Sequence, residues 1–240
     1  MLENILDYER ALFLKLNGAH SLFGDQFMWL FTGFIAWIPV AVSFFVILFY
    51  ANRKRWKETL LIIVALALTI ALCDLFASTL CKPFFARFRP TYHPDFKNDV
   101  TTVFGYIGGQ YGFISSHAAN GFGFATLTSL IFRNRFYTLT LYLWAIVYVY
   151  SRIYLGVHFI SDIIPGILTG LFIGWVVYKL FVLVHKTLFI AKNDRIAFSI
   201  KQYPSNGLMF FLSLVAITVI LISITSMLYA LHAIPAVLIK

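Results

Sequence analysis

Three short segments, far apart in the sequence, combine basic residues and histidines with small or acidic partners. In chain order they are Lys82-(six residues)-Arg89-Pro90, Ser115-Ser116-His117, and Ser151-Arg152-(five residues)-His158-(three residues)-Asp162. All three lie at the ends of long apolar runs. A charged side chain there is energetically unfavourable, so a functional role is expected for it. Together they supply three cations and two histidines, the residue types that cleavage of a phosphate ester requires.

The basic residues and serines are suited to bind a phosphoryl group, whose negative charge must be neutralised during transfer. Arg89 and Arg152 each present a planar fork that matches phosphate oxygens, whereas Lys82 acts as a point charge. Ser115 and Ser116 precede a predicted helix start, where hydroxyl and unpaired backbone N–H groups form a further anion site. We expect these five residues to bind the phosphate.

The two histidines can divide the remaining chemistry. One attacks phosphorus and becomes a phosphohistidine, while the other gives a proton to the leaving alkoxide. Asp162 follows His158 by four residues, so on one helical face its carboxylate can accept the His158 N–H and fix the tautomer. His117 has no acidic neighbour in the sequence. The pattern predicts His158 as nucleophile, Asp162 as the residue that orients it and His117 as general acid.

Each segment taken alone has a simpler explanation. Lys82 and Arg89 could be an anchor that extends to lipid headgroups. His158 and Asp162 could be a structural pair on a helix, or two metal ligands one turn apart. Several fixed cations nearby would repel a divalent metal, so neither a metal nor a cofactor is expected.

Three further residues are candidates for a supporting role. Asp74 lies inside an apolar segment, eight residues or about 12 Å of helix before Lys82. An acid there is expected to face the bundle interior and to have a partner. It could support the cations or touch the substrate, although a structural hydrogen bond is the simpler role. Arg87 and Ser151, inside the first and third segments, are the other two candidates.

The composition excludes an ordinary soluble domain. The chain has 240 residues, of which 60% are hydrophobic and 12% charged, with a mean hydropathy of +0.83. The net charge of +9 does not indicate nucleic acid, because the Lys and Arg residues cluster between apolar segments. Cys73 and Cys81 are too far apart on one predicted helix for a disulfide. Acidic residues near the N-terminus argue against a cleavable signal peptide.

Six apolar segments are long enough, or nearly so, to cross a bilayer as helices. They cover about 27–50, 58–81, 117–132, 136–151, 162–184 and 207–232. Residues 1–17 are predicted to form an amphipathic helix in the membrane interface, although a packed helix without lipid contact fits the same pattern. We expect a single all-α domain over residues 1–240, a six-transmembrane helical bundle with an N-terminal interfacial helix.

The loop charges predict the orientation in the membrane. The loops after the first, third and fifth segments are rich in basic residues, for example Arg53, Arg133 and Lys192, which places them in the cytoplasm. All three chemical segments then lie at the outer face. The compact size favours the inner membrane of a bacterium, with the site facing the periplasm. The glycine- and aromatic-rich outer loop 91–116 could be a mobile cover or an ordinary connection.

The three segments resemble the three-part signature of the type 2 phosphatidic acid phosphatase superfamily, which includes lipid phosphatases, glucose-6-phosphatase and vanadium haloperoxidases. The resemblance spans roughly 82–162, and its first and third parts match at every defining position. The second part reads Ile114-Ser115-Ser116-His117, where the family usually has Pro-Ser-Gly-His. The first part includes Arg87, a basic residue that many members carry, and Phe88 where proline is common.

The resemblance implies a metal-independent membrane lipid phosphatase without a cofactor. It implies the same roles for the residues at the matching positions: His158 as nucleophile, Asp162, His117 as acid, and Lys82, Arg89, Ser115, Ser116 and Arg152 on phosphate. Candidate substrates are undecaprenyl diphosphate, phosphatidylglycerol phosphate, phosphatidic acid and the phosphates of lipid A. A lipid phosphotransferase with the same phosphohistidine is an alternative. A transporter or flippase is a weaker one, because the charges gather at one face instead of along a path.

Overall fold

The computed structural model describes residues 2–51, 56–189 and 205–238, and within these ranges the chain is helical with irregular connections. The α-helices are α1 (Leu2–Asn17), α2 (Leu22–Thr32), α3 (Ile38–Ala51), α4 (Trp56–Asp74), α5 (Lys82–Phe85), α6 (Ser116–Phe132), α7 (Arg135–Tyr154), α8 (Ile160–Phe189) and α9 (Ser205–Leu238). A π-helical stretch, η2 (Leu75–Cys81), joins α4 to α5, and the short turns are η1 (Ile35–Trp37), η3 (Pro90–Tyr92) and η4 (Lys97–Asp99).

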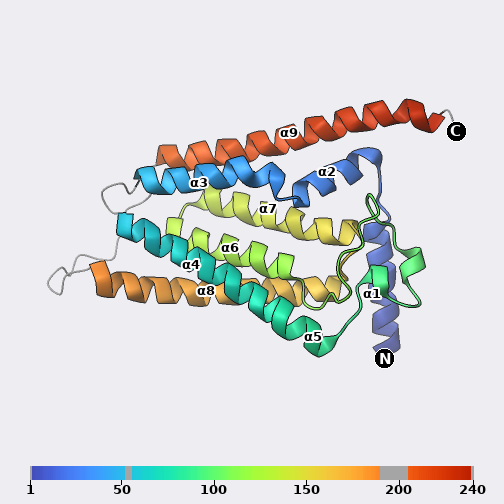
Figure 1. Ribbon diagram of the computed structural model, residues 1–240, viewed down its shortest axis with the longest axis horizontal. Coiled ribbons are helices and arrows are strands. Elements are labelled where there is room, and N and C mark those ends of the chain that lie inside the picture. The colour runs from blue at the N-terminus through green and yellow to red at the C-terminus, as the bar shows by residue number, and fades with distance from the viewer. Residues whose placement is uncertain (1, 52–55, 190–204, 239–240) are drawn as a thin grey trace.

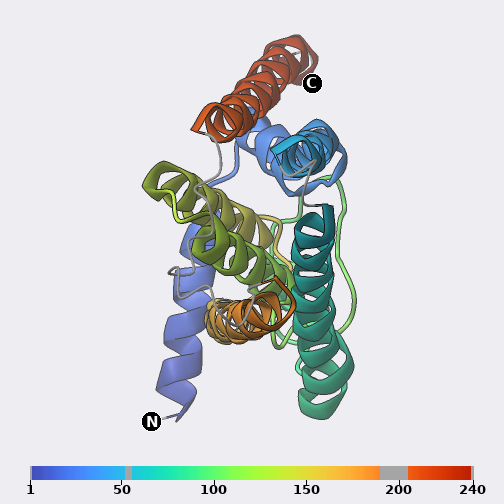
Figure 2. The ribbon, with the colours of Figure 1, turned by 90° about the vertical axis from the view of Figure 1, so that its left-hand side faces the viewer.

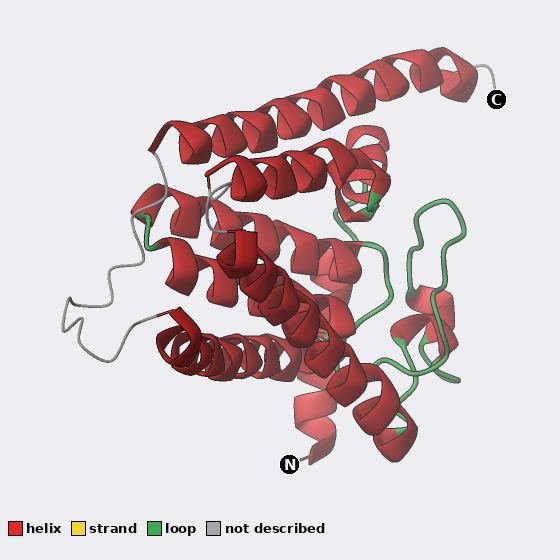
Figure 3. Ribbon diagram, turned by 60° about the vertical axis from the view of Figure 1, so that its left-hand side comes forward, coloured by secondary structure: helices red, strands yellow, loops and turns green. Residues whose placement is uncertain are grey.

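The long helices run along one common direction, with α6 packed between α4, α7 and α8 (Figure 1). Figure 2 looks along this direction and shows α9 and α8 on opposite sides of the bundle. Helix α1 lies across one end, roughly perpendicular to the others (Figure 1). The long irregular segment between α5 and α6 gathers at that same end (Figure 3).

Three of the described helical stretches are long and apolar enough to cross a membrane: Trp56–Phe85, Ile160–Leu188 and Gly207–Ala233. The bent pair α2 and α3 makes a fourth candidate if it counts as one span. Such helices bury their backbone polar groups internally, which is what a bilayer demands. Together with the apolar composition, they make this an integral membrane protein.

The segment predicted over 27–50 as a membrane span is not one straight helix. Helices α2 and α3 meet at an angle of 64°. Gly33 takes an extended conformation at the end of α2, and the Trp37 ring N–H donates to the Phe31 carbonyl at 2.7 Å. Pro39 stands in the first turn of α3, where its missing N–H is tolerated. The break therefore comes from local backbone chemistry, although the apolar character continues through it.

The other predicted segments are helical, with somewhat wider bounds. The helix predicted over 1–17 is present as α1, and it packs against the protein. Its Phe13 ring is fully buried, 5.4 Å from the ring of Phe159, and Asn17 donates to the Tyr154 carbonyl at 2.9 Å. A position of α1 in the membrane interface remains a prediction. Cys73 and Cys81 are free thiols.

A stripe of glycines on α8 allows α6 to approach closely. Gly166, Gly170 and Gly174 follow one another at four-residue spacing, which places them on one face. A Cβ added at Gly166 would lie 2.6 Å from the Ser115 carbonyl oxygen, and one at Gly174 would lie 2.8 Å from that of Gly123. Small residues at such interfaces let helix backbones pack together in membranes. This close packing brings the second chemical segment against the third.

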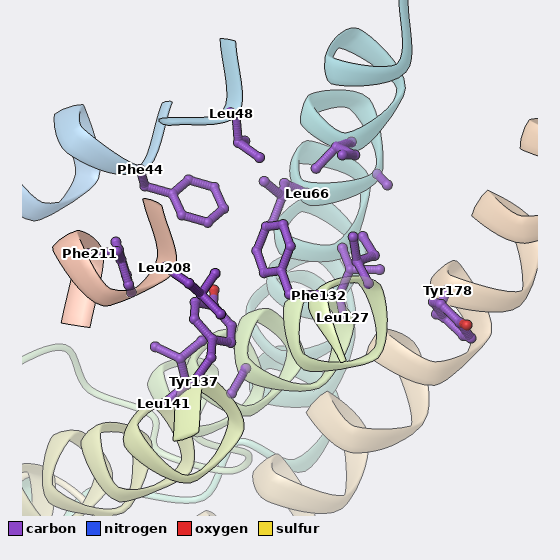
Figure 4. Close-up of a cluster of buried hydrophobic side chains, with 14 of the residues drawn as sticks. Phe44, Leu48, Leu66, Leu127, Phe132, Tyr137, Leu141, Tyr178, Leu208 and Phe211 are labelled. Atoms are coloured by element: carbon purple, nitrogen blue, oxygen red, sulfur yellow. The ribbon is translucent and has the colours of Figure 1, made fainter. Parts of the chain in front are cut away.

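The largest buried apolar cluster holds the opposite end of the bundle. Figure 4 shows Phe44 of α3, Leu66 of α4, Phe132 of α6 and Phe211 of α9 pointing toward one another. The Phe44 ring lies 5.8 Å from that of Phe132 and 5.7 Å from that of Phe211. The aromatic cluster therefore packs the end of the bundle that lies away from the three chemical segments.

Gly170→Val is expected to destabilise the protein, because a branched side chain has no space between α8 and the backbone of α6 at Ala119. Overpacking of this kind costs about 1–3 kcal/mol. The midpoint of thermal unfolding in detergent micelles should therefore fall. Gly109→Ala is the control, since a Cβ at Gly109 meets nothing within 4 Å. Equal midpoints for the two variants would contradict this description of the interface.

Candidate active site

The structure brings the three chemical segments together at the end of the bundle that α1 crosses. Each pair of segments is linked by at least one hydrogen bond. These bonds include Lys82 Nζ to Ser116 Oγ at 3.2 Å, the Ser115 backbone N–H to the Asp162 carbonyl at 2.9 Å, and Arg89 Nη1 to the Val157 carbonyl at 3.3 Å. The predicted convergence of the three segments is therefore present in the fold.

His158 lies in the turn between α7 and α8 and is fully buried. Its Nδ1 is 3.4 Å from Asp162 Oδ2, which also accepts the Phe159 N–H at 3.0 Å. Burial lowers the pKa of the His158 imidazole well below its usual value, and the charges of Arg89, Arg152 and Lys82 lower it further. These effects favour the neutral form of the ring. An acceptor at Nδ1 selects the tautomer that leaves a lone pair on Nε2.

His158 Nε2 is buried and has no hydrogen-bond partner among the described residues. The same is true of Nε of Arg152, whose side chain is 3% exposed. Buried polar atoms are nearly always paired, so unpaired ones ask for an explanation. Both atoms belong to the predicted phosphate site, and an anion placed there would supply acceptors for the arginine.

Arg89 is held in place by the segment before α6. Its Nε donates to the Tyr111 carbonyl at 3.1 Å, and its backbone N–H donates to the Gln110 carbonyl at 3.0 Å. Gly108, with φ of +68°, lies so close that an added Cβ would be 3.0 Å from Arg89 Nη1. Only glycine suits both that conformation and that approach. The loop 91–116 thus contributes directly to the position of a predicted phosphate ligand.

Arg152 stands in the last turn of α7. Its Nη1 donates to Thr32 Oγ1 at 3.1 Å and its Nη2 donates to the Tyr106 hydroxyl at 3.2 Å. Neither partner is evident from the sequence. Thr32 ends α2, immediately before the unpredicted bend, so the bend brings its hydroxyl to the site.

His117 is the second residue of α6 and carries no ion pair with a carboxylate in the described part of the chain. Its ring lies 5.5 Å from that of Tyr148, which stacks on Trp144 at 5.0 Å. Ser115 caps the same helix, because its Oγ accepts the Ala118 N–H at 3.4 Å. Its hydroxyl hydrogen remains available to an anion.

Arg87 connects the site to α1, a link that the sequence does not predict. Its Nη1 donates to Asp162 Oδ1 at 2.7 Å and its Nη2 to Glu9 Oε2 at 2.9 Å. The other Glu9 oxygen accepts the Ser161 N–H at 2.8 Å. Glu9 appears in the sequence as one of several charged residues on an amphipathic helix, 78 positions from Arg87, so no spacing signals the contact.

The other two residues predicted to have a supporting role, Ser151 and Asp74, make different contacts. The Ser151 hydroxyl is buried and donates to the Tyr148 carbonyl at 2.6 Å, so it serves the backbone of α7. Asp74 accepts from the Ser78 hydroxyl at 3.0 Å, and Ser78 accepts from Lys82 Nζ at 3.0 Å. Asp74 is therefore connected to the site through Ser78. Within the described residues, no cluster of three or more His, Cys, Asp or Glu side chains forms a candidate metal site.

Glu9→Gln is expected to weaken the attachment of α1, since it removes the charge that pairs with Arg87 and keeps an oxygen for Ser161. The pair is partly exposed, so we expect a loss of about 1–2 kcal/mol in the free energy of unfolding, measured by denaturation in micelles. In an Arg87→Gln background the loss should largely disappear. Asp7→Asn, an exposed position on the same helix, is the control. An equal loss in both backgrounds would argue against the pair.

Known proteins are similar to this chain in sequence and in fold. Residues 58–186 match the PAP2 superfamily. The chain is 49% identical over 180 residues to the lipid A 4'-phosphatase of Porphyromonas gingivalis, with 75% of each chain covered. It is 39% identical over 179 residues to the lipid A 4'-phosphatase of Bacteroides thetaiotaomicron, with 74% of this chain and 79% of the relative covered.

Two solved structures are similar. The crystal structure of Aquifex aeolicus LpxE has a TM-score of 0.54 at 28% identity, with 70% of this chain and 93% of that chain covered. A PAP2-type phosphatidylglycerolphosphate phosphatase from Bacillus subtilis has a TM-score of 0.58 at 18% identity, covering 75% and 88%, and shows the fold alone. The chain belongs to the PAP2 superfamily and is an integral-membrane lipid phosphatase.

Proposed function

We propose that this lipid phosphatase removes a phosphate from a lipid headgroup at the outer face of a bacterial inner membrane, through a phosphohistidine on His158. The observation that supports this most is the environment of His158. Asp162 lies at its Nδ1, its Nε2 has no hydrogen-bond partner in the described part of the chain, and Arg89, Arg152 and Lys82 are close enough to lower its pKa. A neutral imidazole with one free lone pair, surrounded by fixed cations, is suited to attack a phosphate.

The first step binds the phosphate group. The side chains of Lys82, Arg89 and Arg152 neutralise its charge, and Ser115 and Ser116 add hydroxyl and backbone donors at the start of α6. These groups are positioned before the substrate arrives, so little reorganisation is needed as charge develops.

In the second step His158 Nε2 donates its lone pair to phosphorus. The P–Nε2 bond forms while the bond from phosphorus to the lipid oxygen breaks, and that oxygen takes a proton from His117, which the negative charge of the bound phosphate keeps protonated. Asp162 stabilises the positive charge on the imidazole of the phosphohistidine. The dephosphorylated lipid is the first product.

The third step hydrolyses the intermediate. His117, now neutral, takes a proton from a water molecule whose oxygen attacks phosphorus, and the P–Nε2 bond breaks. Inorganic phosphate leaves, and His158 returns to its starting state. If a sugar or lipid hydroxyl replaced water here, the enzyme would be a phosphotransferase, so the need for an acceptor separates the two activities.

We further propose six spans in a single domain, with both termini outside. The ends of α3, α6 and α8 that precede the basic loops lie at the end of the bundle opposite the site (Figure 1). By the positive-inside rule, this supports a cytoplasmic position for those loops and an outer position for the site. Helix α1 lies perpendicular to the long helices at the outer end, an orientation that suits the membrane interface (Figure 1).

An apolar groove of about 800 Å³ extends from the cluster around Phe44 toward the site. It is lined by residues of η1, α3, α4, α6, α7 and α9, among them Trp37, Phe44, Leu66 and Val215. Tyr148 also lines it, and the Tyr148 ring contacts His117. A lipid whose phosphate meets the cations would place its apolar chains in this groove. Because the two curated relatives are lipid A 4'-phosphatases, we propose the 4'-phosphate of lipid A as the substrate.

Purified enzyme in detergent is expected to release inorganic phosphate from lipid A, with water as the only acceptor and with or without EDTA. Mass spectrometry of the lipid should show loss of the 4'-phosphate and retention of the 1-phosphate. His158→Ala removes the nucleophile, so release should fall to background. Near wild-type turnover by this variant would contradict the mechanism, and loss of the 1-phosphate would contradict the substrate.

His117→Ala is expected to slow the hydrolysis of lipid phosphate monoesters by about 10²–10⁴-fold, the usual contribution of a general acid. Lipid diphosphates should suffer less, because a phosphate leaving group needs less protonation than an alkoxide. The comparison measures kcat for a monoester and a diphosphate of the same polyprenyl chain. Equal losses on both would argue against His117 as the acid.

A further inference from the structure

We infer that Asp74 and Asn120 form a polar subsite inside the apolar groove, which binds a hydrogen-bond donor on the lipid part of the substrate. The donor is a hydroxyl or an amide N–H. This inference rests on the proposed function, since it takes the groove as the place of the lipid. It adds a means by which the enzyme selects among lipid phosphates.

The two residues lie on different helices and line the same groove. Asp74 ends α4, and Asn120 lies in the first turns of α6, three residues after His117. The remaining lining is almost entirely aliphatic or aromatic. A carboxylate and a carboxamide in such surroundings are costly, and ionisable residues inside membrane segments usually mark functional sites.

Neither side chain is fully satisfied by the protein. Asn120 Oδ1 is buried and has no hydrogen-bond partner among the described residues. Asp74 Oδ1 accepts the Ser78 hydroxyl at 3.0 Å, and this is the hydrogen bond that the structure shows for its carboxylate. A carboxylate has room for about four donors. Asp74 is an exposed residue of the groove lining, so its carboxylate is open to a bound lipid, whereas Asn120 offers a buried acceptor.

The position of Asp74 indicates which part of the lipid it meets. Only the Ser78 hydroxyl separates the Asp74 carboxylate from the Lys82 ammonium, since Lys82 Nζ donates to Ser78 Oγ and Ser78 donates to Asp74 Oδ1, each at 3.0 Å. A lipid group that reaches Asp74 therefore stands next to the phosphate, on the part of the lipid that carries it.

Lipid classes differ in the hydrogen-bonding groups that they carry next to the phosphate. The diacylglycerol part of a glycerophospholipid has ester oxygens, which are acceptors, and a polyprenyl chain has no polar atoms. An N-acylated amino-sugar phosphate has amide N–H and hydroxyl donors. A carboxylate that only accepts hydrogen bonds would therefore favour the acylated amino sugar over the other two.

A different role for Asp74 must be separated from this one. Lys82 Nζ donates to Ser78 Oγ, and Ser78 donates to Asp74, so Asp74 could act only by positioning Lys82. In that case every substrate would be affected alike, because all of them carry the phosphate. Ser78→Ala breaks this chain and leaves the Asp74 carboxylate in the groove, which makes it the matched control.

The experiment measures kcat/KM of the full-length enzyme in micelles for two substrates, lipid A and a polyprenyl phosphate. Asp74→Leu and Asn120→Leu keep the groove apolar and of similar volume. We expect the ratio of kcat/KM for lipid A to that for the polyprenyl phosphate to fall about tenfold in Asp74→Leu and by a smaller factor in Asn120→Leu. Ser78→Ala should lower both values in proportion and keep the ratio.

Two results would overturn the subsite. One is a wild-type ratio in Asp74→Leu, and the other is a proportional loss on both substrates that matches Ser78→Ala. Either would leave the phosphohistidine mechanism intact, because that mechanism is tested by the loss of both activities in His158→Ala. Thermal midpoints of the variants close to that of the wild type would confirm that the ratios report recognition and not unfolding.

Discussion

The buried carboxylate of Asp162 is the interaction on which the polar end of this protein depends. It accepts hydrogen bonds from Arg87 and from the Phe159 backbone and lies beside His158, while the Asp162 carbonyl accepts from Ser115. Each donor would cost about 1–3 kcal/mol if left buried and unpaired. Through this one residue the start of α6, the turn before α8 and, by way of Arg87, helix α1 are held in a fixed relation to the proposed nucleophile.

The membrane explains why such a site can exist at the end of an apolar bundle. The helices satisfy their own backbone groups, and the α6–α8 glycine stripe brings two chemical segments together through close backbone packing. Lys82, Arg89 and Arg152 then converge at one end, close enough to disfavour a further positive charge on His158. The mutual repulsion of three cations is offset when a phosphate binds, so the site favours an anion and the transition state derived from it.

Much of this arrangement could be predicted from the sequence, because the spacing of Lys82, Arg89, His158 and Asp162 encodes the chemistry and the loop charges encode the common face. The bend after Thr32 was not predictable from hydropathy, since apolar residues continue through Gly33 and Pro39. Glu9, Thr32 and Tyr106 were missed because their arginine partners lie 78, 120 and 46 residues away. Such contacts depend on how the helices pack against one another. No spacing pattern in a single sequence indicates which distant residues will meet.

The most direct test of the central claim is a structure of the enzyme with orthovanadate, which adopts the five-coordinate geometry of phosphoryl transfer. We expect vanadium to be bonded to His158 Nε2, with its equatorial oxygens in contact with Lys82, Arg89 and Arg152 and its apical oxygen facing His117. Vanadate bonded to His117, or bound away from His158 while activity is inhibited, would contradict the assignment of the nucleophile.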